Sequence, residues 1–233
     1  MGQNRQKMAP PIYGFLICQD GISEILRCIE SVYPYIDKYY VMDGGSKDGT
    51  WELLNKYKDV YNLELYQHPY KQQGDQRNRL LAKIPKNSWI ISIDQDSKLV
   101  AGDVRKFIDE IDPKIYTDKN RHLPLTLGLG FINLVKDAGH YDSNNVITMA
   151  QNFFYNDRNL HFTPGYHMSI CYFETEYNSN MLPTNWVIKH YAHLNPDRIK
   201  AYEDPKERER RSYNEDEWDK KLWKITKLPA NWK

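Results

Sequence analysis

Short hydrophobic runs alternate with segments of helical periodicity over the first hundred residues. The runs have the length and composition of buried parallel strands, and they lie at 12–17, 39–42, 63–66 and 89–93. Between them, apolar residues recur at helical spacing at 22–32, from Thr50 onward and at 74–83. This alternation predicts an α/β domain with a mostly parallel central sheet, right-handed crossovers and flanking helices.

Capping residues indicate where the first two helices begin and end. Asp20 precedes the segment 22–32 and is expected to cap that helix, which Pro34 then closes. Asp48 precedes Thr50 and is expected to cap the second helix in the same way.

The pattern changes after Asp96. We expect a helix at 103–111 and then longer strands at 123–135, 146–155 and 160–173. From residue 197 onward, charges of both signs alternate with tryptophans, which predicts one or two helices packed on the domain, or a flexible tail. The chain therefore divides into an N-terminal tail at 1–9, one domain at 10–195 and a C-terminal helical appendage or tail at 196–233.

Composition narrows the functional class. The chain has 233 residues, 40% of them hydrophobic, which is enough for one sizeable core. Its 32 basic and 31 acidic side chains give a net charge of +1, which argues against a strong nucleic-acid or anionic-membrane binder. No apolar run approaches the ~18 residues of a membrane span, and residues 1–10 do not resemble a signal peptide. Three scattered cysteines favour reduced thiols and a cytoplasmic protein.

A pair of carboxylates follows the predicted strand at 89–93. Asp94 and Asp96 are separated by Gln95, and ligands of open α/β sheets bind just beyond the carboxyl ends of strands. Two hard oxygen ligands at such a position suit Mg²⁺ or Mn²⁺, which in turn can bridge a diphosphate. The alternative is a polar turn that happens to hold two aspartates.

A glycine-rich loop follows the predicted strand at 39–42. It begins with Asp43 and runs to Thr50, and its glycines permit tight turns and close approach to a ligand. Asp43 is placed to accept a hydrogen bond from a nucleobase, although an ordinary strand-to-helix turn would look similar. The loop has no P-loop pattern, and no GxGxxG sequence follows the first strand.

Taken in order, these segments resemble a known family. An early strand, a helix at 22–33, VMDGGSKDGT, GDQRNRLL and SIDQD follow one another as in the inverting family 2 glycosyltransferases of the GT-A fold. The resemblance covers residues 10–100 well, with weaker similarity up to about 195. It implies the GT-A fold and an enzyme that moves a sugar from a nucleotide-diphosphate donor, most commonly a UDP-sugar, to an acceptor hydroxyl.

The resemblance also implies a donor site. Asp43 corresponds to the aspartate that recognises the nucleobase, and Arg77 corresponds to a helix residue that reaches the nucleotide. Arg77 could equally be a solvated helix arginine. Asp94 corresponds to the residue near the sugar and ribose. The full donor-binding set is Gln19, Asp20, Asp43, Gly45, Arg77, Asp94 and Gln95.

The metal site implied by the resemblance comprises Asp94, Asp96 and His190. His190 lies in a KHY sequence similar to the element whose histidine completes the metal site in related enzymes, and His193 is the alternative ligand. An imidazole beside two carboxylates favours Mn²⁺ somewhat over Mg²⁺.

The resemblance leaves the general base open, because Met168 stands where the family often has a glutamate. The candidates are His167 first, then Asp142 and Glu174. The stretch 139–145 is a candidate lid that would exclude water from the site.

Two other classes remain open. One is a nucleotidyltransferase, and the other is a non-catalytic nucleotide-sugar binding protein. Residues 18–21 lack the glycine-rich, basic loop that usually opens a nucleotidyltransferase, and the two aspartates argue against a mere binder. The acceptor is left open between a glycan, a lipopolysaccharide core and a hydroxymethylated DNA base.

Overall fold

The structure is a computed structural model. It describes residues 9–69, 71–116, 126–156, 160–163, 170–172, 179–181, 186–191, 194 and 224–230.

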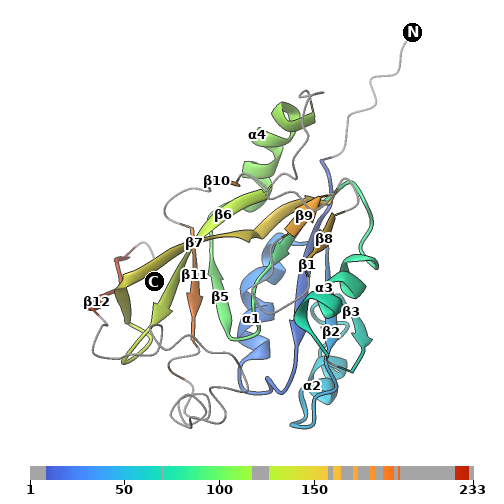
Figure 1. Ribbon diagram of the computed structural model, residues 1–233, viewed down its shortest axis with the longest axis horizontal. Coiled ribbons are helices and arrows are strands. Elements are labelled where there is room, and N and C mark those ends of the chain that lie inside the picture. Colours follow the sequence, from blue (N-terminus) through green and yellow to red (C-terminus); the bar gives the residue numbers. More distant parts are fainter. Residues whose placement is uncertain are drawn as a thin grey trace.

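A parallel β-α unit forms the first half of the domain (Figure 1). Strands β1 (Ile12–Cys18), β2 (Lys38–Asp43), β3 (Leu63–Gln67) and β4 (Ser88–Ser92) pair in parallel in the order β3-β2-β1-β4. The helices α1 (Ile25–Val32), α2 (Thr50–Lys56) and α3 (Gln73–Leu81) connect them. The carboxyl ends of the four strands therefore meet at one edge of the sheet.

The sheet continues through strands of mixed direction. Its full order is β3-β2-β1-β4-β7-β6-β11-β5, with β7 antiparallel to β4 and β11 antiparallel to β5. The added strands are β5 (Ser97–Val100), β6 (Thr126–Leu134), β7 (His140–Asn156) and β11 (Val187–His190). Helix α4 (Val104–Tyr116) follows β5, and a 3-10 turn at Tyr33–Tyr35 follows α1.

Two hydrophobic layers enclose this sheet. On one face, Ile25, Cys28 and Ile29 of α1 pack on β1, β2 and β4 together with residues of α2 and α4. On the other face, Leu80 and Leu81 of α3 pack with a smaller cluster that includes Phe15, Ile90, Phe154 and Phe162. The predicted α/β fold with flanking helices is confirmed.

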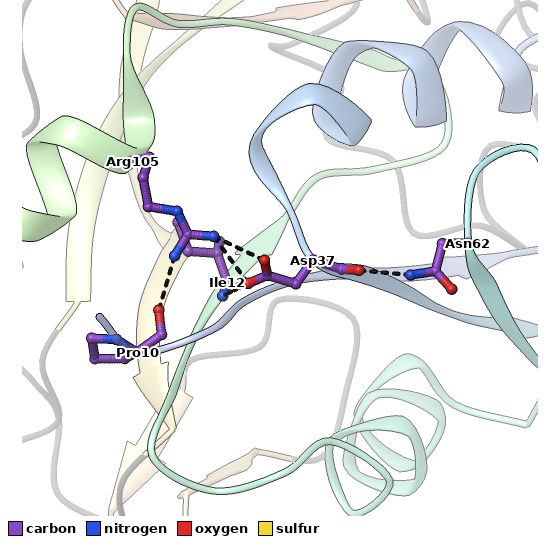
Figure 2. A network of polar contacts seen from close by, with 5 residues as sticks. All are labelled: Pro10, Ile12, Asp37, Asn62 and Arg105. Carbon is purple, nitrogen blue, oxygen red and sulfur yellow. Dashed lines mark hydrogen bonds and ion pairs between the residues drawn. The ribbon is translucent and has the colours of Figure 1, made fainter. Parts of the chain in front are cut away.

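A polar network ties the amino ends of β1 and β2 to α4, as Figure 2 shows. Arg105 donates to both carboxylate oxygens of Asp37, at 3.1 and 3.0 Å, and to the carbonyl of Pro10 at 3.0 Å. Asp37 also accepts the backbone N–H of Ile12 at 2.8 Å, and its carbonyl accepts Asn62 Nδ2 at 2.7 Å. This network lies at the edge of the sheet opposite the carboxyl ends of the parallel strands.

The first helix begins later than its predicted cap. Asp20 has a φ of 48° and its carboxylate accepts the backbone N–H of Lys47 at 2.8 Å, so it cannot cap α1, which starts at Ile25. Asp48 does accept the backbone N–H of Thr50 at 3.0 Å, although Gly49 is the residue that precedes α2. The Asp20 cap prediction is therefore wrong.

Three further segments differ from expectation in their strands. The predicted strand at 160–173 contains two short antiparallel strands, β8 (Leu160–Phe162) and β9 (Ile170–Tyr172). The expected lid at 139–145 lies almost entirely in β7, whose residues 140–142 pair with β12 (Ile225–Lys227). A C-terminal helix or tail was expected at 196–233. The described part of that segment, 224–230, contains strand β12. Strand β10 (Ser179–Met181) adds to β6.

No helix among the described residues is both long enough and apolar enough to cross a membrane.

A tight contact at Gly14 gives a stability prediction. A Cβ at residue 14 would lie 2.6 Å from Cε2 of Tyr39, a fully buried ring on the neighbouring strand β2. We expect Gly14→Ala to destabilise the protein by about 1–3 kcal/mol through overpacking, measured by urea unfolding. Gly130→Ala is the matched control, because its nearest atom would be Cγ1 of Val187 at 3.5 Å. Equal stability of the two variants would show that the Tyr39 ring does not restrict residue 14.

Candidate active site

The carboxyl edge of the parallel strands brings together most of the expected donor site. Cys18 ends β1, Asp43 ends β2, and Asp94 follows β4 by two residues. Because β1 pairs with both β2 and β4, the loops that begin at these three points lie next to one another.

Asp43 holds the glycine-rich loop. Its side chain is fully buried, and Oδ2 accepts the backbone N–H groups of Gly45 and Ser46 at 2.9 and 3.0 Å and Nε2 of Gln67 at 3.0 Å. Oδ1 accepts the hydroxyl of Ser46. Gly45 has a φ of 91°, which a side chain would strain. In this structure, Asp43 acts on the site through the loop that it organises.

The loops after β1 and β2 are bonded to each other. The backbone N–H of Asp20 donates to Oγ of Ser46 at 2.9 Å, in addition to the bond from Lys47 to the Asp20 carboxylate. The N–H of Gly21 donates to Oγ1 of Thr50 at 2.9 Å. These contacts cross-link the two loops that the resemblance assigns to the nucleotide.

Asp48 adds a further link between them. Its Oδ2 accepts the N–H of Ile22 at 2.9 Å, and its Oδ1 accepts the N–H of Thr50. Burial raises the pKa of this carboxyl, but the hydrogen bonds from Thr50 and Ile22 outweigh that effect and lower it below its ordinary value.

Gln95 joins the third loop to the end of β1. Its Nε2 donates to the carbonyl of Gln19, and its Oε1 accepts the N–H of Gln19, both at 2.9 Å. A Cβ on Gly21 would lie 2.9 Å from the Gln95 amide, so the glycine allows this close approach. Gln95 therefore fixes the position of the two aspartates that flank it.

Arg77 and Asp94 form an ion pair at this edge. Arg77 Nη2 lies 3.0 Å from Asp94 Oδ1, and the Arg77 side chain is 12% exposed whereas that of Asp94 is 46% exposed. The guanidinium carbon also lies 5.4 Å from the centre of the Phe162 ring. The Arg77 side chain is therefore fixed by Asp94 and the Phe162 ring at this edge, which excludes the alternative of a solvated helix arginine.

Asp96 differs from Asp94 in its surroundings. Its side chain is 2% exposed, and its carbonyl accepts the N–H of Tyr191 at 2.9 Å. Strand β11 pairs with β5 so that His190 lies opposite Ser97, the residue after Asp96. The backbone thus brings position 190 beside the second aspartate.

Charges of this site reach α1. Burial raises the pKa of the Cys28 thiol above its ordinary value; the hydrogen bond with Tyr39 lowers it, the charges of Asp94 and Asp96 raise it, and Arg27 lowers it.

The side chains expected to bind a metal have the chemistry that suits a divalent cation. Asp94 and Asp96 supply the carboxylate oxygens that Mg²⁺ and Mn²⁺ prefer, and the backbone brings His190 to the same end of the sheet. Within the described part of the chain, no three His, Cys, Asp or Glu side chains form a preformed metal cluster.

Of the three candidate general bases, Asp142 is the one that lies among the described residues. Asp142 is 1% exposed, lies opposite Ile225 in the β7–β12 ladder and accepts the N–H of Lys224 at 2.9 Å. This position gives Asp142 a role in holding β12. His167, Met168, Glu174 and His193 lie outside the described residues.

Two positions of the site were not found from the sequence. Gln67, which supports Asp43, is the last residue of β3, one residue beyond the predicted strand. Asn78 follows Arg77 in the GDQRNR segment, and its side chain bonds the backbone of Phe162. The available signals in the sequence were the strand end for Gln67 and the adjacency to Arg77 for Asn78.

Comparisons with known proteins bear on the family and the fold. Residues 17–116 match the model of the family described as "Glycosyl transferase family 2". This range contains every loop described above that follows β1, β2 or β4, and over these residues the match agrees with the resemblance to family 2 glycosyltransferases. A search of curated proteins found no match.

Solved structures of TarS from S. aureus share the fold. TarS 1-349 in complex with UDP-GlcNAc superposes with a TM-score of 0.51 at 13% identity, over 74% of this chain and 59% of that one. TarS 1-349 in complex with UDP gives a TM-score of 0.50 at 13% identity, over 75% and 61%. This chain thus spans about three-fifths of the TarS fragment that it matches.

The contacts of Asp43 yield a prediction. Replacing Asp43 with alanine leaves the loop N–H groups of Gly45 and Ser46 without their acceptor, which should destabilise the protein by about 1–3 kcal/mol. Hydrogen exchange at these two amides should accelerate, and urea unfolding gives the stability change. Asp59→Ala, at an exposed aspartate, is the control. Unchanged protection at residues 45 and 46 would show that Asp43 does not hold the loop.

Proposed function

We propose that this chain, which carries a family 2 glycosyltransferase domain of the GT-A fold, transfers a sugar from a nucleotide-diphosphate donor to an acceptor hydroxyl with inversion at the anomeric carbon. The observation that carries this proposal is the Arg77–Asp94 ion pair at the edge where the loops after β1, β2 and β4 converge. A positive and a negative group at this edge suit a ligand that has both phosphates and hydroxyls.

In this proposal, the nucleotide-sugar donor binds to the loops and side chains described above. The loops held by Asp43 and Gln95 form the wall for the nucleoside, and Arg77 provides positive charge for the phosphates. Asp94, the more exposed carboxylate, accepts hydroxyls of the ribose and the sugar. The complexes of TarS with UDP and UDP-GlcNAc make UDP-sugars the first donors to test.

A divalent cation, Mn²⁺ or Mg²⁺, would be held by Asp94, Asp96 and His190 and would neutralise charge that develops on the departing diphosphate. Asp96 suits this role because its enclosed position keeps a charged ligand in one place, beside the end of β11.

The transfer itself requires a base and an acceptor. The acceptor oxygen attacks the anomeric carbon from the face opposite the diphosphate, a side chain takes the hydroxyl proton, and the electron pair of the breaking bond leaves with the diphosphate. His167 is the first candidate for the base, followed by Asp142 and Glu174. The acceptor is a hydroxyl of a glycan, of a lipopolysaccharide core or of a hydroxymethylated DNA base.

The free, buried thiols of Cys18 and Cys28 agree with a cytoplasmic reaction.

The metal-binding role of Asp96 is tested by substitution. We expect Asp96→Asn to lower the release of UDP from a UDP-sugar with Mn²⁺ by at least about a hundredfold, because a ligand that stabilises the transition state is lost. Excess EDTA should abolish release by the wild-type chain. Asp59→Asn is the matched control, because it removes an exposed carboxylate distant in sequence.

Other outcomes would decide against this function. Full turnover in excess EDTA would contradict the metal role. If the chain binds UDP-sugars but releases no UDP with any acceptor tested, it is a non-catalytic binding protein. Release of pyrophosphate from a nucleoside triphosphate and a sugar phosphate would make it a nucleotidyltransferase.

A further inference from the structure

Asn78 of α3 is joined to the backbone of β8. Its Nδ2 donates to the carbonyl of Phe162 at 2.9 Å, and its Oδ1 accepts the N–H of Phe162 at 2.7 Å. The two residues are 84 positions apart in the sequence. The side-chain amide thus makes both hydrogen bonds that a neighbouring strand would make, and it fixes β8 against the helix.

The Phe162 ring is in turn fixed by the core. It is 1% exposed, stacks on Phe15 with ring centres 5.8 Å apart, and meets Phe154 edge-on at 6.1 Å. One face of this ring remains for Arg77, whose guanidinium carbon lies 5.4 Å from the ring centre. The backbone that Asn78 holds therefore carries the ring on which Arg77 rests.

Two contacts set the orientation of the guanidinium. The Phe162 ring lies on one side, and Asp94 accepts Nη2 at 3.0 Å on the other. Nε is enclosed and makes no hydrogen bond to the described residues. The hydrogen bond to Asp94 uses Nη2, and no bond of Nη1 is found among the described residues, so Nη1 is the nitrogen that we assign to an anionic oxygen of a ligand.

We propose that Asn78 is a positioning residue of the donor site: by holding β8 on α3, it keeps the Phe162 ring beneath Arg77 and so directs the guanidinium toward Asp94 and the diphosphate. This inference rests on the proposed function. Asn78 does not itself need to touch the donor, so its effect on donor binding should pass through Arg77.

A double-mutant cycle tests that route. Asn78→Ala should weaken the binding of UDP to the full chain about tenfold, because two hydrogen bonds that support Arg77 are lost. Arg77→Ala should weaken UDP binding at least as much. The double variant should bind UDP no more weakly than Arg77→Ala alone. Isothermal titration calorimetry measures the four affinities.

Asn55→Ala is the matched control. Asn55 is also a helical asparagine whose Nδ2 donates to a backbone carbonyl, that of Trp51 at 2.8 Å, but it lies in α2 and is exposed. Its loss should leave UDP affinity unchanged. If Asn78→Ala does not fold, Phe162→Leu replaces it in the cycle, because this variant keeps the backbone bonds to Asn78 and removes the aromatic face.

A second measurement needs no ligand. The Nε–H of Arg77 is enclosed, so its exchange with water, followed by ¹⁵N NMR, should become about tenfold faster in Asn78→Ala if the guanidinium loses its support. Unchanged exchange would overturn the inference, as would independent effects of the two substitutions on UDP affinity. Failure of the wild-type chain to bind UDP would instead reject the proposed function, and the exchange rate would still decide the role of Asn78.

Discussion

The parallel pairing of β1 with β2 on one side and β4 on the other is the constraint on which the site depends. Parallel strands joined by right-handed crossovers end at the same edge, so loops that begin at residues 19, 44 and 93 must meet there. Side chains from one loop then bond the backbone of the next, as Gln95 does with Gln19 and Asp20 with Lys47. The loops of this edge are therefore held by one another as well as by the strands.

Differences in burial give Asp43 and Asp94 at this edge different roles. Asp43 is fully buried and its carboxylate is occupied by the loop, whereas Asp94 is half-exposed and pairs with Arg77 at the surface of the site. A buried carboxylate that accepts several N–H groups is a structural anchor, and an exposed one beside an arginine remains open to a ligand. The same residue type therefore supports the loop at one strand end and faces the donor at the next.

The first half of the fold could be predicted from the sequence, because each β-α unit has its own periodicity. The hydrophobic runs at 12–17, 39–42, 63–66 and 89–93 all lie within observed strands or extend one residue beyond them. Beyond Asp96, the outcome depends on pairings between distant segments, such as β12 with the start of β7, and local pattern contains no information on these. Most donor-site positions were found because loops at strand ends have a characteristic composition. The supports of those positions, Gln67 and Asn78, were missed, because a side-chain amide that bonds a distant backbone leaves no periodic signal.

The proposed function requires that the edge formed by the ends of β1, β2 and β4 binds a nucleotide diphosphate. Titration of the ¹⁵N-labelled chain with UDP, followed by the shifts of its backbone amides, tests this binding without any acceptor. We expect the amides of Gln19, Gly45 and Gln95 to shift with one common affinity, while those of Asp37, Asn62 and Arg105 at the opposite edge do not move. Shifts confined to the opposite edge, or no shifts at millimolar UDP, would show that the nucleotide does not bind where the parallel strands end.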